Sequence, residues 1–190
     1  MAVAARLVLA SSSPRRSELL RAAGIEFVPG LPGPEPAAAG TPEQLAVARA
    51  RSKACGGVRP SGCALPLLGV DTVVDVDGVE LGKPQDRSEA AAMLRRLAGR
   101  LHRVHTAHCL FDPGRGLAVE ELASATVACR DIAAAELERY LDSGDWRGKA
   151  GSYGIQDGTQ MFLRVVEGAY DTVVGLHVPA VLRLLRAAAP

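Results

Sequence analysis

Strand signals and helix signals alternate along this chain, and the alternation limits its fold more than any other feature of the 190 residues. Residues 6–10 form a short apolar run typical of a strand. A Ser-rich turn with Pro14 follows, and apolar residues then recur at helical spacing up to Gly24. Strand followed by helix recurs further along without internal repeats. We therefore predict an α/β fold with a mixed sheet and antiparallel hairpins.

The best-supported helix runs from about Pro42 to Cys55. Thr41 supplies an N-cap, Pro42 occupies the first helical position, and Gln44 completes a capping box. A pair of glycines after Cys55 ends the helix. Further helices are predicted at 86–98, 133–141 and 179–188.

The predicted strands differ in how many of their faces are exposed to solvent. The nearly continuous apolar run Leu65–Val70 is typical of a strand covered on both faces, and it ends at Asp71. Asp77-Gly78 between two apolar runs predicts a hairpin. Further strands are predicted at 101–111, 117–129 and 161–166, with a surface loop rich in Pro, Gly and Ala at 29–41.

Composition excludes several classes of protein. Lys and Arg (22) nearly balance Asp and Glu (21), and the chain has three Phe, three Tyr and one Trp, so we expect no nucleic-acid partner. No apolar run approaches the ~18 to 20 residues that cross a membrane, and the short apolar start is interpreted as a strand, not a signal peptide. The four cysteines lack C-x-x-C spacing, which predicts free thiols in a cytoplasmic protein. The length predicts one domain over 1–190.

The segment from Ser11 to Ser17 is the most informative for function. If Ser13 caps the helix, Arg15 and Arg16 lie in its first turn, where the helix dipole disfavours each cation by roughly 0.3 to 1 kcal/mol. An anion would compensate. Free backbone N–H groups, serine hydroxyls and two guanidinium groups therefore indicate a phosphate site. The alternative is two solvated arginines beside an ordinary cap.

Four other residues are candidates only in combination. Asp71 is predicted at the C-terminal end of a buried strand, where open α/β sheets bind ligands and where a carboxylate can bind Mg²⁺ or take a proton from water. Its alternative role is a cap or turn residue. Lys53 on the capped helix and Lys83 after the hairpin each resemble a surface lysine. Gln156, in a glycine-rich loop, could read a base edge or bond its own backbone.

Two patterns suggest other chemistry and are disfavoured. Cys109 and Arg115 fit the H-C-x5-R spacing of cysteine phosphatases, but Pro113 removes a backbone donor and Asp112 repels phosphate. Histidines at 102, 105 and 108 suggest a metal. On a strand, residues three apart face opposite sides of the sheet, which argues against a shared zinc.

Taken together, these segments resemble the Maf family of nucleoside triphosphate pyrophosphatases over nearly the whole chain. The resemblance rests on the order and spacing of LASSSPRRSELLRAAGI, the Lys53-Ala54 pair, GVDTVV, LGKPQD, AAMLRRLAGRLHRVHT, SGDWRGKAGSYGIQDG and YDTVVGL. It implies an elongated mixed β-sheet flanked by helices, similar to inosine triphosphatases, with two lobes around a central cleft. It also implies a possible homodimer.

The resemblance further implies cleavage of a nucleoside triphosphate to a monophosphate and pyrophosphate with Mg²⁺ or Mn²⁺, in the branch that acts on dTTP and UTP. A nucleotide-binding regulator of septum formation is the alternative. The implied site divides into catalytic residues Asp71, Lys83 and Lys53, metal ligands Asp71 and Glu35, and substrate-binding residues Ser11, Ser13, Arg15, Arg16, Thr72 and Gln156. Asp157 stands where the family usually has Gly.

Overall fold

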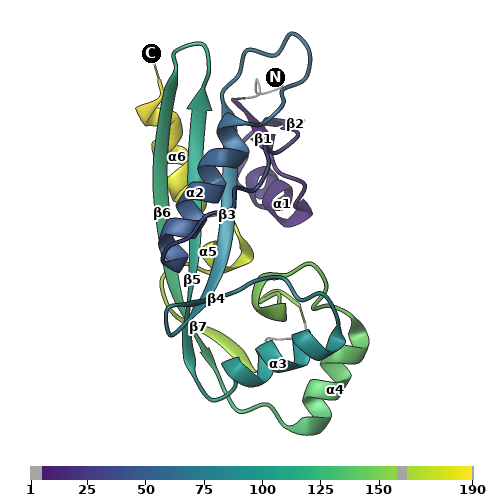
Figure 1. Cartoon of the computed structure of the whole chain (residues 1–190). Coiled ribbons are helices and arrows are strands. Elements are labelled where there is room, and N and C mark those ends of the chain that lie inside the picture. The colour runs from purple at the N-terminus through teal and green to yellow at the C-terminus, as the bar shows by residue number, and fades with distance from the viewer. Residues whose placement is uncertain (1–5, 158–161, 190) are drawn as a thin grey trace.

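The computed structural model describes residues 6–157 and 162–189 and shows an elongated molecule built on one mixed sheet (Figure 1). The sheet has seven strands in the order β2-β1-β3-β5-β6-β7, and β4 pairs with β3. The strands are β1 Leu7–Ala10, β2 Phe27–Gly30, β3 Leu67–Val76, β4 Val79–Leu81, β5 Leu101–Asp112, β6 Leu117–Cys129 and β7 Leu163–Glu167. The helices are α1 Pro14–Ala22, α2 Pro42–Cys55, α3 Arg87–Leu97, α4 Ala134–Ser143, the short 3₁₀ helix η1 Ala150–Ser152, α5 Tyr170–Val174 and α6 Val178–Ala187.

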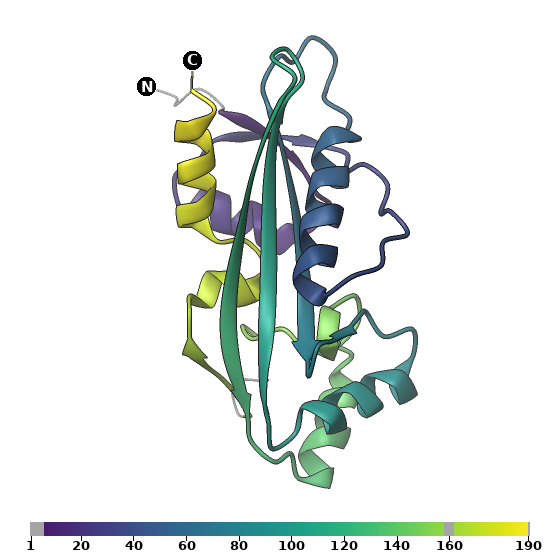
Figure 2. The ribbon, with the colours of Figure 1, turned by 60° about the vertical axis from the view of Figure 1, so that its left-hand side comes forward.

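The sheet combines both pairing directions, which confirms the predicted mixed α/β fold. β1 pairs in parallel with β2 and β3, whereas the β3–β5, β5–β6 and β6–β7 ladders are antiparallel. The long β5–β6 hairpin runs along the molecule, with α2 on one side and α5 and α6 on the other (Figure 2). Helices α3 and α4 pack together near one end.

One edge of β3 is interrupted, and this interruption creates room for a site. β1 pairs with β3 only at Leu67 and Leu68, and β4 pairs with it only from Val74 onward. On the opposite side, pairing with β5 continues without a break from Leu67 to Asp75. Asp71 is therefore in the middle of β3, and its predicted position at the end of a strand is wrong. The strand that ends near Asp71 is the neighbouring β1, while β3 continues to Val76.

Helix α2 lies unusually close to β3 because the residues between them are small. Ala46, Ala50 and Ala54 on the inner face of α2 are all buried. A Cβ added to Gly69 of β3 would lie 2.2 Å from the carbonyl oxygen of Ala50 and 2.4 Å from the backbone nitrogen of Ala54. Gly69 and Asp71 share a face of the strand, so this close approach brings α2 within reach of Asp71.

Several local predictions are refined by the structure. Ser13 occupies the N-cap position of α1 as expected, although its side chain makes no capping bond. The capping box of α2 is present. The predicted loop 29–41 was too long, because its first two residues belong to the edge strand β2, where a proline is tolerated. Met161, the predicted start of the last strand, lies outside the described residues.

The structure also bears on the excluded classes. Over 6–157 and 162–189, no helix combines the length and the apolar character that a membrane crossing requires. Cys55, Cys63, Cys109 and Cys129 are all free thiols, as predicted.

We expect Gly69→Ala to destabilise the protein by about 1–3 kcal/mol, since the new methyl group overlaps the backbone of α2 and forces the helix off the sheet. The measurement is urea unfolding followed by circular dichroism. Gly114→Ala is the matched control, because its added Cβ meets only the Asp112 side chain, at 3.3 Å. Equal stability of the two variants would contradict the close packing described above.

Candidate active site

A cavity of about 830 Å³ opens beside the interrupted edge of β3. This volume lies within the range of small-molecule sites. Its walls come from the start of α1, the loop before α2, α2 itself, β3 and the segment 147–156. Every candidate residue from the sequence lines it: Ser11, Ser13, Arg15, Arg16, Glu35, Lys53, Asp71, Thr72, Lys83 and Gln156.

Lys53 joins the two acidic candidates. Its Nζ atom lies 2.5 Å from Oδ1 of Asp71 and 2.7 Å from Oε1 of Glu35. Lys53 and Asp71 are both buried, while Glu35 is exposed. The other carboxylate oxygen of Asp71, Oδ2, is buried with no hydrogen-bond partner among the described residues. A buried carboxylate oxygen without a partner indicates a place for a cation or a water molecule.

Glu35 reaches the cavity because its loop is anchored to the end of α2. The backbone nitrogen of Gly33 donates to the carbonyl of Lys53 at 3.1 Å, and the Ser52 hydroxyl donates to the carbonyl of Pro34 at 2.7 Å. A Cβ at Gly33 would lie 2.3 Å from the carbonyl oxygen of Ser52, so only glycine fits. The hydrogen bond from Lys53 lowers the pKa of Glu35, with Lys83 and Arg49 adding to the effect, and keeps this carboxylate charged.

Arg16 is held in place by three protein acceptors. Nε donates to the carbonyl of Gly175 at 2.9 Å, and Nη1 donates to the hydroxyl of Ser11 at 3.0 Å. Nη2 donates to the hydroxyl of Thr72 at 3.3 Å. Burial lowers the pKa of Arg16 to about 10, and the nearby Asp71 opposes this shift. The guanidinium is thus charged at neutral pH, and its Nη1 and Nη2 atoms retain N–H groups for a ligand.

A chain of hydroxyls behind Arg16 fixes its direction. The hydroxyl of Thr106 donates to the carbonyl of Thr172 at 2.7 Å, so it accepts from Thr72, whose hydroxyl lies 3.0 Å away. Thr72 in turn accepts from Arg16. Thr106 is fully buried, and the sequence reasoning missed it because a threonine in an apolar strand gives no signal of a polar chain.

Arg15 contrasts with its neighbour. It is partly exposed and lines the same cavity, but within the described part of the chain it makes no hydrogen bond or ion pair. The two arginines therefore differ: the protein immobilises Arg16 and leaves the whole guanidinium of Arg15 for a ligand.

The opposite wall carries Lys83 and the segment 147–156. The backbone nitrogen of Gly151 donates to the carbonyl of Gly82 at 3.0 Å, which ties this segment to the turn that presents Lys83. Gln156 is exposed at the rim of the cavity. Asp157 forms an ion pair with Lys149, so its charge is balanced next to Gln156.

Sequence reasoning missed other charged residues in the wall. Arg49 and Glu80 form a bidentate pair at its edge, and Arg147 and Lys149 line it from the far side. Arg49 had a usable signal, because it precedes Lys53 by four residues and so shares its helix face. The wall contains three carboxylates, Glu35, Asp71 and Glu80. They are outnumbered by its basic side chains, which are Arg15, Arg16, Arg49, Lys53, Lys83, Arg147 and Lys149. The cavity favours a polyanion.

The cysteine phosphatase alternative is wrong. Burial raises the pKa of the Cys109 thiol to about 12, so the thiolate nucleophile does not form at neutral pH. Arg115 is exposed and donates to the carbonyl of Ala188 at 2.6 Å. Neither residue lines the cavity.

The three histidines of β5 have separate partners, as the strand spacing predicted. Nε2 of His102 lies 2.7 Å from the hydroxyl of Tyr153, and Nε2 of His108 accepts from the backbone nitrogen of His177 at 2.9 Å. Burial lowers the pKa of both His102 and His108 to about 4, so both are neutral. His105 lies with two carboxylates instead.

Fold and site together define an α/β protein with a cationic cleft of small-molecule size, built around a buried Lys-Asp pair. Comparison with known proteins gives the family. The model of the Maf-like proteins matches residues 6–188, and the chain belongs to this family.

Curated relatives cover almost the whole chain. A protein of Bordetella parapertussis named dTTP/UTP pyrophosphatase is 44% identical over 196 residues, covering 96% of this chain and 92% of its own length. Proteins of the same name from Salmonella typhimurium and Thermus thermophilus are 41% and 42% identical, each covering 94% of this chain and 91% and 92% of their own lengths. Among solved structures, a HAM1 protein from Coxiella burnetii matches 65% of this chain and 71% of its own chain with a TM-score of 0.42 at 20% identity.

We expect Thr106→Val to weaken binding of inorganic tripolyphosphate by up to about tenfold, because loss of one hydroxyl frees Thr72 and releases Arg16 from its fixed direction. Isothermal titration calorimetry measures the affinity. Thr106→Ser retains the hydroxyl and should bind like the wild type. Thr126→Val is the control for loss of a hydroxyl from a β-strand, because the hydroxyl of Thr126 donates to Glu167, away from the cavity. A Thr106→Ser defect as large as that of Thr106→Val would contradict the hydroxyl chain.

Proposed function

We propose that this chain hydrolyses dTTP and UTP to the nucleoside monophosphate and pyrophosphate. The observation that carries the proposal is the buried Asp71, fixed by Lys53 and facing Arg15 and Arg16 across one cavity. Relatives at 41–45% identity that bear the name dTTP/UTP pyrophosphatase support the choice of reaction and substrate.

The triphosphate would bind at the start of α1. Free backbone N–H groups of the first helical turn, the hydroxyls of Ser11 and Ser13 and the two arginines converge there. Lys83 reaches the same cavity from the opposite wall. We assign Arg15 and Lys83 to the β- and γ-phosphates, since neither side chain has a hydrogen bond or ion pair within the described residues. We assign Arg16, whose direction is fixed, to one phosphate oxygen.

A divalent metal fits the acidic side of the cavity. Asp71 Oδ2 lacks a partner within the described residues, and the Glu35 carboxylate is held beside the same lysine. Carboxylate oxygens are the ligands that Mg²⁺ and Mn²⁺ prefer. We assign the metal to Asp71 and Glu35. When bound, it would neutralise phosphate charge and lower the pKa of a coordinated water.

The protein's own groups would then carry the proton and position the reactants. Lys53 holds Oδ1 of Asp71, so Oδ2 keeps two lone pairs: one would bind the metal, and the other would accept a proton from the attacking water. Water forms a new P–O bond as the anhydride between the α- and β-phosphates breaks. The pyrophosphate that leaves carries the electron pair of the broken bond, and the charges of Lys83 and Arg15 stabilise it.

Base selection would fall to the rim. The Gln156 amide can donate to O4 and accept from N3–H of thymine or uracil, a pattern that cytosine lacks. Thr72 would contribute indirectly, because its hydroxyl is already bonded to Arg16 and Thr106.

We also propose that 1–190 acts as a single two-lobed domain in the cytoplasm and pairs with a second copy. The continuous β3–β5 ladder supports the single domain, because it links the residues around α1 and α2 with those around α3 and η1. The free thiols are typical of a reducing compartment. The dimer rests on the family resemblance.

We expect Asp71→Asn to lower kcat by roughly 10²–10⁴-fold, because the amide keeps the shape but accepts no proton. The assay measures pyrophosphate released from dTTP, UTP, 7-methyl-GTP and ITP with Mg²⁺. Asp145→Asn, at an exposed aspartate, is the matched control. Orthophosphate as the sole product of the wild type, or full activity of Asp71→Asn, would overturn the proposed reaction.

We expect Gln156→Ala to reduce kcat/KM for UTP about tenfold, which corresponds to one hydrogen bond, and to leave kcat/KM for CTP unchanged, because cytosine lacks the matching donor and acceptor pattern. Steady-state kinetics with both nucleotides measure the ratio. Gln85→Ala, at another exposed glutamine, should leave the ratio as in the wild type. An unchanged UTP to CTP ratio in Gln156→Ala would assign base selection elsewhere.

A further inference from the structure

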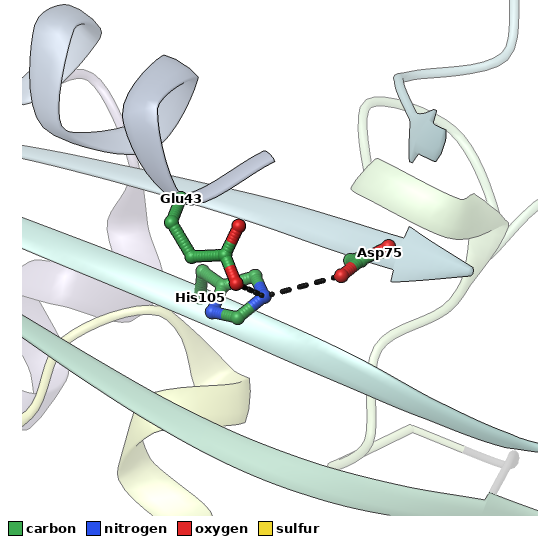
Figure 3. A group of neighbouring side chains, drawn as sticks. All are labelled: Glu43, Asp75 and His105. Atoms are coloured by element: carbon green, nitrogen blue, oxygen red, sulfur yellow. Dashed lines mark hydrogen bonds and ion pairs between the residues drawn. The ribbon is translucent and has the colours of Figure 1, made fainter. Parts of the chain in front are cut away.

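A second group of ionisable side chains lies outside the cavity, on the face of the sheet that α2 covers. Glu43 from the first turn of α2, Asp75 of β3 and His105 of β5 point toward one another (Figure 3). None of the three lines the cavity. They come from segments far apart in the sequence, and neither the proposed reaction nor the packing of α2 on β3 requires them.

The distances in this group suit a metal ion better than hydrogen bonds. Nε2 of His105 lies 3.4 Å from Oδ2 of Asp75 and 3.5 Å from Oε1 of Glu43. Hydrogen bonds from nitrogen to oxygen are usually about 2.7–3.2 Å long. A tetrahedral ion with bonds of about 2.0–2.1 Å places adjacent ligand atoms roughly 3.3 Å apart. All three donor atoms lie within 4.8 Å of one another.

Groups outside the cluster orient each donor toward its centre. Nδ1 of His105 lies 2.8 Å from the hydroxyl of Ser124, and donation from Nδ1–H would leave the lone pair of Nε2 facing the two carboxylates. The backbone nitrogen of Gly78 donates to Oδ1 of Asp75 at 2.8 Å, which leaves Oδ2 directed at His105. Arg103 donates at 3.2 Å to Oε1 of Glu43, the oxygen that also faces His105, so a bound ion would share Oε1 with Arg103 or use Oε2. Such outer partners are typical of metal ligands.

Burial and charge favour a cation in the same place. His105 is fully buried and Asp75 nearly so, whereas about a third of the Glu43 side chain is exposed and offers a route from solvent. Within the described residues, Arg103 pairs with Glu43 and no arginine or lysine pairs with Asp75, so the cluster retains negative charge. A buried carboxylate is costly unless a cation or hydrogen bonds compensate it.

We propose that Glu43, Asp75 and His105 bind a divalent transition metal such as Zn²⁺ or Co²⁺, with one nitrogen, two carboxylate oxygens and a fourth position for water. The imidazole ligand selects these ions over Mg²⁺, which prefers oxygen. The site is separate from the cavity. Asp75 follows Asp71 by four residues of strand, about 13 Å, and Glu43 precedes Lys53 by ten residues of helix, about 15 Å.

The bound metal would fasten the first turn of α2 to β3 and β5. The same helix carries Arg49 and Lys53 into the cavity, about 9 Å and about 15 Å along the helix from Glu43. The metal is thus structural, and it differs from the ion assigned to the nucleotide in both ligands and place.

The test is a Zn²⁺ titration of chelator-treated full-length protein in excess Mg²⁺, which occupies oxygen-only sites. Nitrogen-15 NMR of the four histidine side chains reports the ligand directly. We expect one equivalent of Zn²⁺ to shift Nε2 of His105 and to leave His102, His108 and His177 unchanged. A Co²⁺ titration should give visible absorption at the same stoichiometry.

Variants make the result specific. We expect Asp75→Asn and Glu43→Gln to weaken Zn²⁺ binding at least tenfold, whereas Asp77→Asn, an exposed aspartate of the same hairpin, binds like the wild type. Circular dichroism checks the fold of each variant, and the partly exposed Glu43 carries the test if Asp75→Asn does not fold. No histidine shift, equal shifts of all four histidines, or wild-type affinity in Glu43→Gln would overturn the proposal.

Discussion

The close contact between α2 and β3 is the constraint on which the rest of the structure depends. Gly69 has no side chain, and alanines face it from the helix, so the helix backbone rests almost directly on the strand. Lys53 can then reach Asp71, and the end of α2 can anchor the loop that carries Glu35. The start of the same helix brings Glu43 to Asp75 and His105. The short distance between α2 and β3 thus determines the positions of two groups of charged side chains, one around Lys53 and one around His105.

The side chains that line the cavity are of two kinds: some are held in place by other protein groups, and others are available to bind a ligand. Lys53 fixes one oxygen of Asp71, Oδ1, and Arg16 is held by a carbonyl and two hydroxyls. Arg15, within the described residues, has no such partner. Fixed charges need no reorganisation when a ligand arrives, which strengthens their effect on a developing charge, while an uncommitted arginine can follow the ligand.

Much of this arrangement could be predicted from sequence, because its signals are local. The capping box predicted α2, the Asp-Gly turn predicted the hairpin, and the Ser-Pro-Arg-Arg turn predicted that Arg15 and Arg16 lie at a helix start, where they line the cavity. The position of Asp71 was not local: whether β3 ends there depends on its pairing with β5 thirty or more residues later. Thr106 and Glu80 were not predicted as site residues, because their hydrogen-bond partners lie on other helices and strands and leave no local signal in the sequence.

The interruption beside β3 also decides what kind of molecule the protein admits. Between the end of β1 and the start of β4, residues 69–73 have no strand neighbour on that side among the residues that the structure describes. A long strand edge with unpaired N–H and C=O groups can pair with an extended polypeptide, which then adds a strand to the sheet. The protein's own strands close this gap at both ends and leave an extended peptide five residues of strand edge, about 16 Å, to pair with. The same interruption therefore opens the strand to the cavity and limits the addition of a foreign strand to the sheet.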